Sequence, residues 1–211
     1  MQKHLPTTPR PRMIVGISGA TGIIYGLNLL ARLRTLNIES HLVITKAGER
    51  TLAYETELRV REVRALADHC YSDADIGAAI ASGSFRTMGM IVAPCSVRSL
   101  SAMATGNTDG LLTRAADVCM KERRRLVLLF REAPLHVGHI RAMAAATESG
   151  AIVFPPVPAF YDRPQSLDEM VNHTVGRVLD LFDVDAGLVR RWDGRPVRTA
   201  TATAIPESSD N

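Results

Sequence analysis

The sequence is poor in several features that mark common classes of protein. Aromatic residues make up only 5% of the 211 residues, which leaves few rings for stacking on nucleic-acid bases. The three cysteines, Cys70, Cys95 and Cys119, are an odd number and lack the spacing of metal ligands. This usage suits a reducing compartment, where disulfides are rare. We therefore expect a soluble cytoplasmic protein.

Long apolar runs and long runs of charge are also missing. No stretch approaches the ~20 apolar residues that cross a membrane, and the N-terminus lacks the apolar segment of a signal peptide. The net charge is only +3, with lysine and arginine scattered among acids. The one dense basic cluster, residues 121–125, is also typical of a solvated helix end, where cations are favourable. We expect neither a membrane nor a nucleic-acid partner.

Apolar residues, by contrast, make up 46% of the chain, enough for one substantial core. Strand-like and helix-like segments alternate along residues 13–194, without a repeat, and this predicts a single α/β domain with a parallel sheet covered by helices on both faces. Residues 1–12 and 195–211 are polar or small and lack periodicity, so we expect flexible tails there.

Hydrophobic periodicity places the individual elements of this domain. The expected strands cover residues 13–18, 41–45, 88–94, 125–130 and 151–154. The expected helices cover residues 23–33, 47–55, 58–68, 95–104, 109–122, 135–149 and 166–182.

A glycine-rich turn joins the first expected strand to the first helix. Its glycines, Gly16, Gly19 and Gly22, allow close approach of a ligand, and a helix start presents unpaired N–H groups. The spacing differs from the G-x-G-x-x-G of dinucleotide folds, and Thr45 stands where an NAD site favours an acid. The turn therefore indicates a phosphate-bearing mononucleotide, with a purely structural glycine turn as the alternative.

Polar side chains gather where the expected strands end, which is where ligands of parallel α/β folds bind. Hydroxyl groups recur at three of these ends, and small donors of this kind suit a phosphate and a polar ring edge. The residues at the strand ends are Ser18, Thr21, Thr45, Lys46, residues 94–99, residues 131–134 and residues 155–161.

Several motifs in order resemble the flavin prenyltransferase family, the UbiX-like flavoproteins that also occur as the small subunit of hydroxyarylic acid decarboxylases. The motifs, which span residues 13–194, are GISGATG, YETE, ASGSF, APCSVRSLSAMATG, DGLLTRAADVCMKERR, FREAPLH, PPVPAFYDRPQSLDEMV and the final RRW.

The resemblance implies a Rossmann-like flavoprotein subunit in a large homo-oligomer, commonly a dodecamer, that binds FMN at subunit contacts. Members of the family join a dimethylallyl group from dimethylallyl monophosphate to N5 and C6 of reduced FMN, without a metal. The product is the prenylated FMN that a partner decarboxylase uses.

The resemblance also assigns roles to residues of this sequence. The flavin contacts would be Gly19, Ala20, Thr21, Thr45, Ser96, Val97, Arg98, Ser99 and Arg131. The prenyl phosphate would be bound by Arg114, Lys121, Tyr161 and Arg177, with Trp192 closing the site. Glu132 would lie beside this phosphate and Glu55 near the flavin ring. From the chemistry of the reaction we hypothesise that Glu132 protonates the leaving phosphate and that Glu55, through the Thr21 hydroxyl, accepts the proton lost from C6.

Each assignment has a simpler alternative. Arg114 and Lys121 are seven residues apart, a spacing that is also typical of an ordinary charged helix face. Glu55 could equally be a solvated acid near a helix end. His136 and His139 share a helix face but lack further metal ligands. Cys95 has no evident base beside it, so a small buried thiol is favoured over a nucleophile.

Two positions depart from the family pattern. Thr21 stands where many relatives have serine, which keeps the hydroxyl but adds a methyl group that crowds the site. Arg98 replaces lysine or a smaller residue.

Two other functions stay open. One is an FMN-binding accessory subunit of a decarboxylase that has no turnover of its own. The other is a flavin-dependent cysteine decarboxylase, which needs an early catalytic histidine. His41 is expected inside a strand, which argues against this second alternative.

Overall fold

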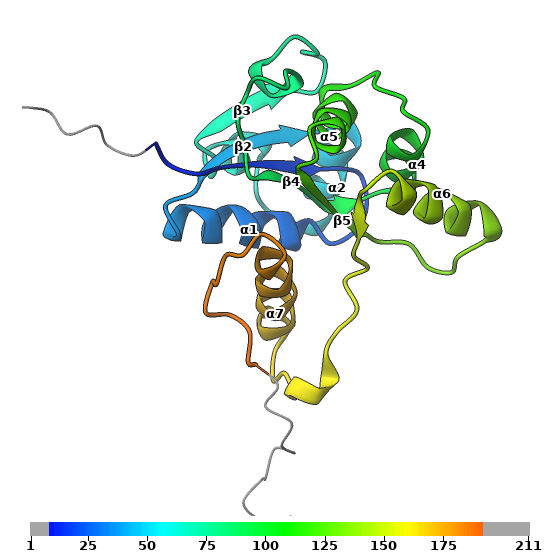
Figure 1. Ribbon diagram of the computed structural model, residues 1–211. Coiled ribbons are helices and arrows are strands. Elements are labelled where there is room, and N and C mark those ends of the chain that lie inside the picture. The colour runs from blue at the N-terminus through cyan, green and yellow to red at the C-terminus, as the bar shows by residue number, and fades with distance from the viewer. Residues whose placement is uncertain (1–8, 192–211) are drawn as a thin grey trace, which may run out of the picture.

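The computed structural model describes residues 9–191, which form a parallel β-sheet between two layers of helices (Figure 1). The strands are β1 (Arg12–Ile17), β2 (Glu39–Ile44), β3 (His69–Ser72), β4 (Gly89–Cys95), β5 (Arg125–Phe130) and β6 (Ile152–Val153). The α-helices are α1 (Ile23–Thr35), α2 (Lys46–Glu55), α3 (Val60–Arg64), α4 (Val97–Ala104), α5 (Leu111–Lys121), α6 (Val137–Glu148) and α7 (Leu167–Asp180). Two short 3-10 helices are η1 (Ala79–Ala81) and η2 (Phe160–Asp162).

The strand order is β3-β2-β1-β4-β5-β6, and every neighbouring pair is parallel. This is the doubly wound order, in which the chain leaves β1 in one direction along the sheet and later returns to its other side at β4. The predicted α/β class is therefore confirmed. The order reverses between β1 and β4, so the loops after these strands diverge and leave a crevice at their carboxyl ends.

The core consists of two apolar layers, one on each face of the sheet. Met13, Val15 and Ile17 point towards α1 and α7, while Ile14 points towards α5 on the other face. Because β1 is buried on both faces, its sequence is apolar at nearly every position instead of alternating. Within residues 9–191, no helix combines the length and apolarity that would be needed to cross a bilayer.

Two glycines of the turn after β1 have steric roles. A Cβ atom on Gly19 would lie 2.4 Å from the Cβ of Ala47, so a side chain there would push α2 away from the turn. Gly22 caps α1 with a φ of 98°, a left-handed conformation that side chains rarely adopt. The structural interpretation of the glycine turn therefore applies at both positions.

The largest difference from the predicted elements lies at residues 58–72. The predicted helix 58–68 is shorter, Val60–Arg64, and it is followed by β3, which the periodicity did not indicate. This strand is only four residues long, and three of them are exposed. A short edge strand carries neither a buried apolar run nor regular alternation, so it leaves no pattern to recognise.

Residues 9–12, which the sequence analysis assigned to the N-terminal tail, lie within the described part of the structure. β1 begins at Arg12, and the residues before it already contact the sheet. Arg10 forms an ion pair with Asp68 (2.8 Å), and the Pro11 carbonyl accepts a hydrogen bond from Glu39 N. Trp192 and the predicted tail at residues 195–211 lie outside the described residues.

Candidate active site

A cavity of about 840 Å³ lies at the carboxyl ends of the central strands. This volume is in the range of small-molecule sites, and the location is the one that the strand order predicts. The cavity is lined by Gly19, Ala20, Thr21, Ile44, Thr45, Lys46, Ala47, Glu49, Arg64, Ser72, Asp73, Ala74, Ser96, Val97, Arg98, Ser99, Ala102, Asn107, Asp109, Gly110, Leu112, Thr113, Arg131 and Glu132.

All nine residues predicted to contact the flavin line this one cavity. They come from four separate loops: residues 19–21 follow β1, Thr45 follows β2, residues 96–99 follow β4 and Arg131 follows β5. The parallel sheet brings these loops together because all its strands end at the same edge. The predicted acid, Glu132, lies on the same cavity wall.

The first turns of α2 and α4 lie at the cavity. Thr45 caps α2 by accepting a hydrogen bond from Gly48 N (3.0 Å). Ser96 caps α4 by accepting one from Ser99 N (3.3 Å), and its hydroxyl donates to Ser99 Oγ (3.2 Å). Other N–H groups of each first turn have no partner within the helix, and the positive ends of both helix dipoles favour an anion in the cavity.

The N-terminus of α1 differs from those of α2 and α4, because a carboxylate of the protein already binds its N–H groups. Glu55 accepts hydrogen bonds from Gly22 N (3.1 and 3.0 Å to its two oxygens) and from Ile23 N (2.9 Å). The N–H groups of Gly22 and Ile23 are therefore satisfied within the protein, and it is residues 19–21 of the turn that line the cavity. Glu55 is also no simple solvated acid. It fixes the turn next to Thr21, which does line the cavity.

Ser18, expected among the polar groups at the site, has a structural role instead. Its side chain is buried, donates to the Pro94 carbonyl (2.9 Å) and accepts from Ser96 N (2.8 Å). These bonds tie the end of β1 to the end of β4 across the point where the strand order reverses. Ser18 therefore positions Ser96 without facing the cavity.

Several cavity residues escaped the sequence analysis. Arg64 and Glu49 form an ion pair (2.8 Å) on the wall, and Asp73 accepts a hydrogen bond from Leu112 N (2.9 Å) at the start of α5. Asp73 directly follows β3. Recognition of β3 as a strand would have placed Ser72 and Asp73 at the ligand-binding edge by the same rule that found the other loops.

The residues predicted to bind the prenyl phosphate lie elsewhere. Arg114 pairs with Asp117 (2.9 Å), Lys121 with Glu122 (2.5 Å), and Arg177 with Asp180 (2.8 Å).

All three cations are on α5 and α7, are partly exposed and lie outside the lining of the cavity, as does Tyr161 on η2. Figure 1 shows α7 and η2 extending away from the sheet. A single copy of residues 9–191 therefore does not join these side chains to the cavity, and their role stays a prediction.

For Cys95 and His136, the structure supports a simpler role than catalysis or metal binding. Burial raises the pKa of the Cys95 thiol to about 12, so this residue is a core thiol and not a nucleophile. His136 Nδ1 accepts a hydrogen bond from Gly138 N (3.0 Å), and the ring caps α6. His41 lies inside β2, is 2% exposed and is not among the residues that line the cavity.

Comparison with known proteins places this cavity in a family. A family model described as "Flavoprotein" matches residues 1–172. The flavin prenyltransferase UbiX of Escherichia coli K12 is 56% identical over 87% of this chain and 98% of its own length. The chain belongs to the UbiX-like flavin prenyltransferase family.

Solved structures of the family share the fold. AnUbiX, crystallised in complex with FMN and dimethylallyl pyrophosphate, superposes with a TM-score of 0.87 at 49% identity, covering 89% of this chain and all of that one. A dodecameric FMN-dependent UbiX-like decarboxylase from Escherichia coli O157:H7 gives a TM-score of 0.84 at 48% identity, covering 87% of this chain and all of that one. The resemblance noted in the sequence motifs is thus confirmed.

Proposed function

We propose that this protein is a flavin prenyltransferase that joins a dimethylallyl group from dimethylallyl monophosphate to N5 and C6 of reduced FMN. One observation carries the proposal. The nine residues that the sequence motifs assign to the flavin line a single cavity, in a chain that is 56% identical to a flavin prenyltransferase. The product, prenylated FMN, serves a partner decarboxylase that acts on aromatic acids.

The cavity suits FMN, which supplies the nucleophilic ring atoms when it is bound. Two helix N-termini, capped by Thr45 and Ser96, provide N–H donors for a phosphate, and Arg98 and Arg131 add positive charge. The small residues at 19–21 let a flat ring approach the backbone closely.

Glu132 is the proposed acid for the leaving phosphate. It lies on the cavity wall, with Oε1 accepting a hydrogen bond from Ala133 N (3.1 Å). A dianionic phosphate beside a carboxyl group favours its protonated form, and Glu132 then gives that proton to the phosphate oxygen as the allylic C–O bond breaks. Arg131 opposes this effect by favouring the ionised carboxylate.

Glu55 and Thr21 are proposed to remove the proton from C6 once the second bond has formed there. Glu55 is held by Gly22 N and Ile23 N, directly after Thr21 in the chain. The Thr21 hydroxyl would pass the proton from the ring to the carboxylate, which becomes a neutral carboxylic acid.

The donor phosphate is bound in our proposal by Arg114, Lys121, Tyr161 and Arg177, with Trp192 closing the site. Because Arg114, Lys121, Tyr161 and Arg177 lie outside the lining of the cavity of their own copy, we place them at the cavity of a neighbouring copy in a homo-oligomer, in a dodecamer as in the Escherichia coli O157:H7 structure. Exposed apolar residues offer surfaces for such contacts. They are Leu135, Val137, Ile140, Val157, Phe160 and Leu167.

We place this activity in the cytoplasm. Support comes from the cysteines, since Cys70, Cys95 and Cys119 are all free thiols.

Anaerobic incubation of the purified protein with reduced FMN and dimethylallyl monophosphate tests the function. We expect a flavin whose mass has increased by one five-carbon prenyl unit. A parallel reaction with dimethylallyl diphosphate shows which donor is used. If FMN binds but neither donor gives a prenylated flavin, the protein is the accessory subunit and the prenyltransferase proposal is wrong.

A further inference from the structure

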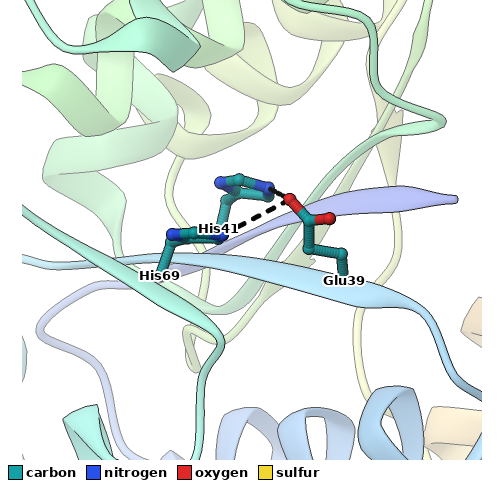
Figure 2. Close-up of side chains that lie close together, drawn as sticks. All are labelled: Glu39, His41 and His69. Carbon is teal, nitrogen blue, oxygen red and sulfur yellow. Dashed lines mark hydrogen bonds and ion pairs between the residues drawn. The ribbon is translucent and has the colours of Figure 1, made fainter. Parts of the chain in front are cut away.

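A second cluster of chemically active side chains lies near the amino-terminal ends of β2 and β3, away from the cavity at the carboxyl edge. It consists of Glu39 and His41 on β2 and His69 on β3 (Figure 2). Glu39 and His41 are two residues apart and so share one face of the strand. His41 pairs in register with His69, which places the two imidazoles side by side on that face.

The polar atoms of the cluster converge on one carboxylate oxygen. Glu39 Oε1 lies 2.9 Å from His41 Nε2 and 3.4 Å from His69 Nε2, as the dashed lines in Figure 2 show. The two rings stack with centroids 4.7 Å apart. All three potential ligand atoms lie within 4.8 Å of one another.

We propose that Glu39, His41 and His69 bind a divalent transition-metal ion of the zinc type. Two imidazoles and a carboxylate are a ligand set that suits zinc and its neighbours, and three protein ligands leave the remaining position to water. Bonds of about 2.1 Å at tetrahedral angles separate ligand atoms by about 3.4 Å. The two separations from Glu39 Oε1 are already close to this value.

The buried ligand is held in place by its neighbours. His41 is only 2% exposed, its Nδ1 lies 3.0 Å from the Tyr71 hydroxyl, and the Phe85 ring packs edge-on at 4.9 Å. When Nδ1–H donates to the hydroxyl of Tyr71, the Nε2 lone pair faces Glu39 and is free for a metal. A hydrogen bond of this kind is the usual way in which a ligand imidazole is oriented.

The other histidine has the freedom to complete the site. The His69 side chain is 54% exposed and stands on the edge strand of the sheet. Stacked rings direct their lone pairs in parallel, so metal binding requires His69 to rotate until its Nε2 converges with that of His41. Because more than half of this side chain is exposed, the rotation exchanges the stacking contact with His41 for metal coordination.

Arg12 is a built-in competitor of the metal. Its Nε lies 3.2 Å from Glu39 Oε1, while its guanidinium lies 4.9 Å from the centroid of the Phe85 ring. A positive charge at this distance weakens the binding of a cation to the same oxygen. Removal of Arg12 should therefore tighten metal binding, whereas a purely structural cluster would show no such gain.

A bound metal would join β2 to the short edge strand β3. We expect it to stabilise the fold and to leave the prenyl transfer chemistry without a metal. The other histidine pair, His136 and His139, has ring centroids 3.7 Å apart and is the obvious rival. It offers only two ligands, and the Nδ1 of each ring accepts a backbone N–H.

Cobalt titration of the full-length, untagged protein tests the proposal. After chelator treatment, we expect one equivalent of Co²⁺ to give the visible absorption of a four-coordinate site, and Zn²⁺ to displace it and raise the melting temperature. His69→Gln should weaken binding by more than about tenfold. Arg12→Gln should strengthen it, and a double His136→Gln, His139→Gln variant should bind like the parent.

Three results would overturn the site. The first is the absence of the cobalt spectrum, and the second is cobalt binding by His69→Gln that is as strong as in the parent. The third is loss of cobalt binding in the His136→Gln, His139→Gln variant. A melting curve of His69→Gln without metal shows whether that variant folds. If His69→Gln does not fold, the Arg12→Gln variant tests the proposal instead. Cobalt binding by Arg12→Gln that is unchanged or weaker than in the parent contradicts the proposed site.

Discussion

At the scale of single residues, the surroundings of a side chain separate catalytic candidates from core residues. Cys95 is the last residue of β4 and Glu132 follows the neighbouring strand β5, and both are the residue types of reactive groups. Glu132 faces a cavity with charged neighbours, whereas Cys95 is fully buried. Their chemical behaviour should differ accordingly.

Glu132→Gln should slow prenyl transfer by about 100-fold or more while FMN binding is retained. The amide keeps the size of the side chain but has no acidic proton for the leaving phosphate. Turnover under anaerobic conditions and flavin fluorescence titration measure the two properties. Glu148→Gln, an exposed carboxylate on α6, is the matched control and should behave like the parent. An active Glu132→Gln enzyme would remove this residue from the mechanism.

Cys95 and Cys119 should resist alkylation in the folded protein. Burial raises the pKa of both thiols to about 12, above the ordinary value of 9.0, so almost no reactive thiolate is present at pH 8. The same thiols should react readily in urea, where the ordinary pKa returns. Mass spectrometry after iodoacetamide treatment measures the labelling. Equal rates for Cys95 in native buffer and in urea would contradict the structure.

At the scale of elements, the site depends on how helix starts and strand ends are fastened. Glu55 at the end of α2 satisfies the start of α1, and Ser18 at the end of β1 holds the start of α4 through Ser96. Neither contact is local in sequence. Both determine where the cavity walls lie.

Ser18→Ala should destabilise the fold by about 1–2 kcal/mol, because it leaves the half-buried Ser96 N without its acceptor and the Pro94 carbonyl with only the Ser18 N–H as a donor. It should also weaken FMN binding, since Ser96 lies on the cavity wall. Urea denaturation and flavin titration measure the two effects. Ser149→Ala, at an exposed helix end, should change the stability by less than about 0.5 kcal/mol. A stable Ser18→Ala protein would show that the link is dispensable.

Substitutions of Glu55 should separate its structural role from its catalytic one. Glu55→Ala removes all three acceptor contacts at the start of α1 and should cost about 1–2 kcal/mol of folding free energy, together with activity. Glu55→Gln keeps one acceptor oxygen, so it should retain most of the stability but lose turnover. Denaturation curves measure the stability of both variants, and product formation measures their turnover. An active Glu55→Gln protein would leave Glu55 with a positioning role alone.

At the scale of the whole molecule, the proposed site is divided between copies of the chain. The cavity residues belong to the carboxyl edge of the sheet, and the basic residues of α5 and α7 lie outside it. Each of these cations is partly exposed and pairs with an acid close by in the sequence: Asp117, Glu122 or Asp180.

Hybrid oligomers test this division. Glu132→Gln and Arg177→Ala should each be inactive alone, but co-expression should restore part of the activity, because some sites then combine an intact cavity from one copy with an intact Arg177 from another. Separately purified proteins mixed without exchange of subunits serve as the control. If the hybrids remain as inactive as the single variants, both residues act within one copy.

The sequence by itself determined the alternation of elements, the apolar faces of the sheet and the loops at the strand ends, because these follow from periodicity and from residues close together in the chain. It also carried the motifs of the family. It gave no sign of β3, of the use of Glu55 at α1, or of the structural role of Ser18.

Only the tertiary structure decided these points. Which donor meets which acceptor, and which cations stay outside the cavity, depend on distances between residues far apart in the chain. The carboxylate on the α1 N-terminus shows the reason, since Glu55 and Gly22 are 33 residues apart and meet only when α2 packs beside the turn. A local pattern identifies a group that can bind an anion, but packing determines which anion reaches it.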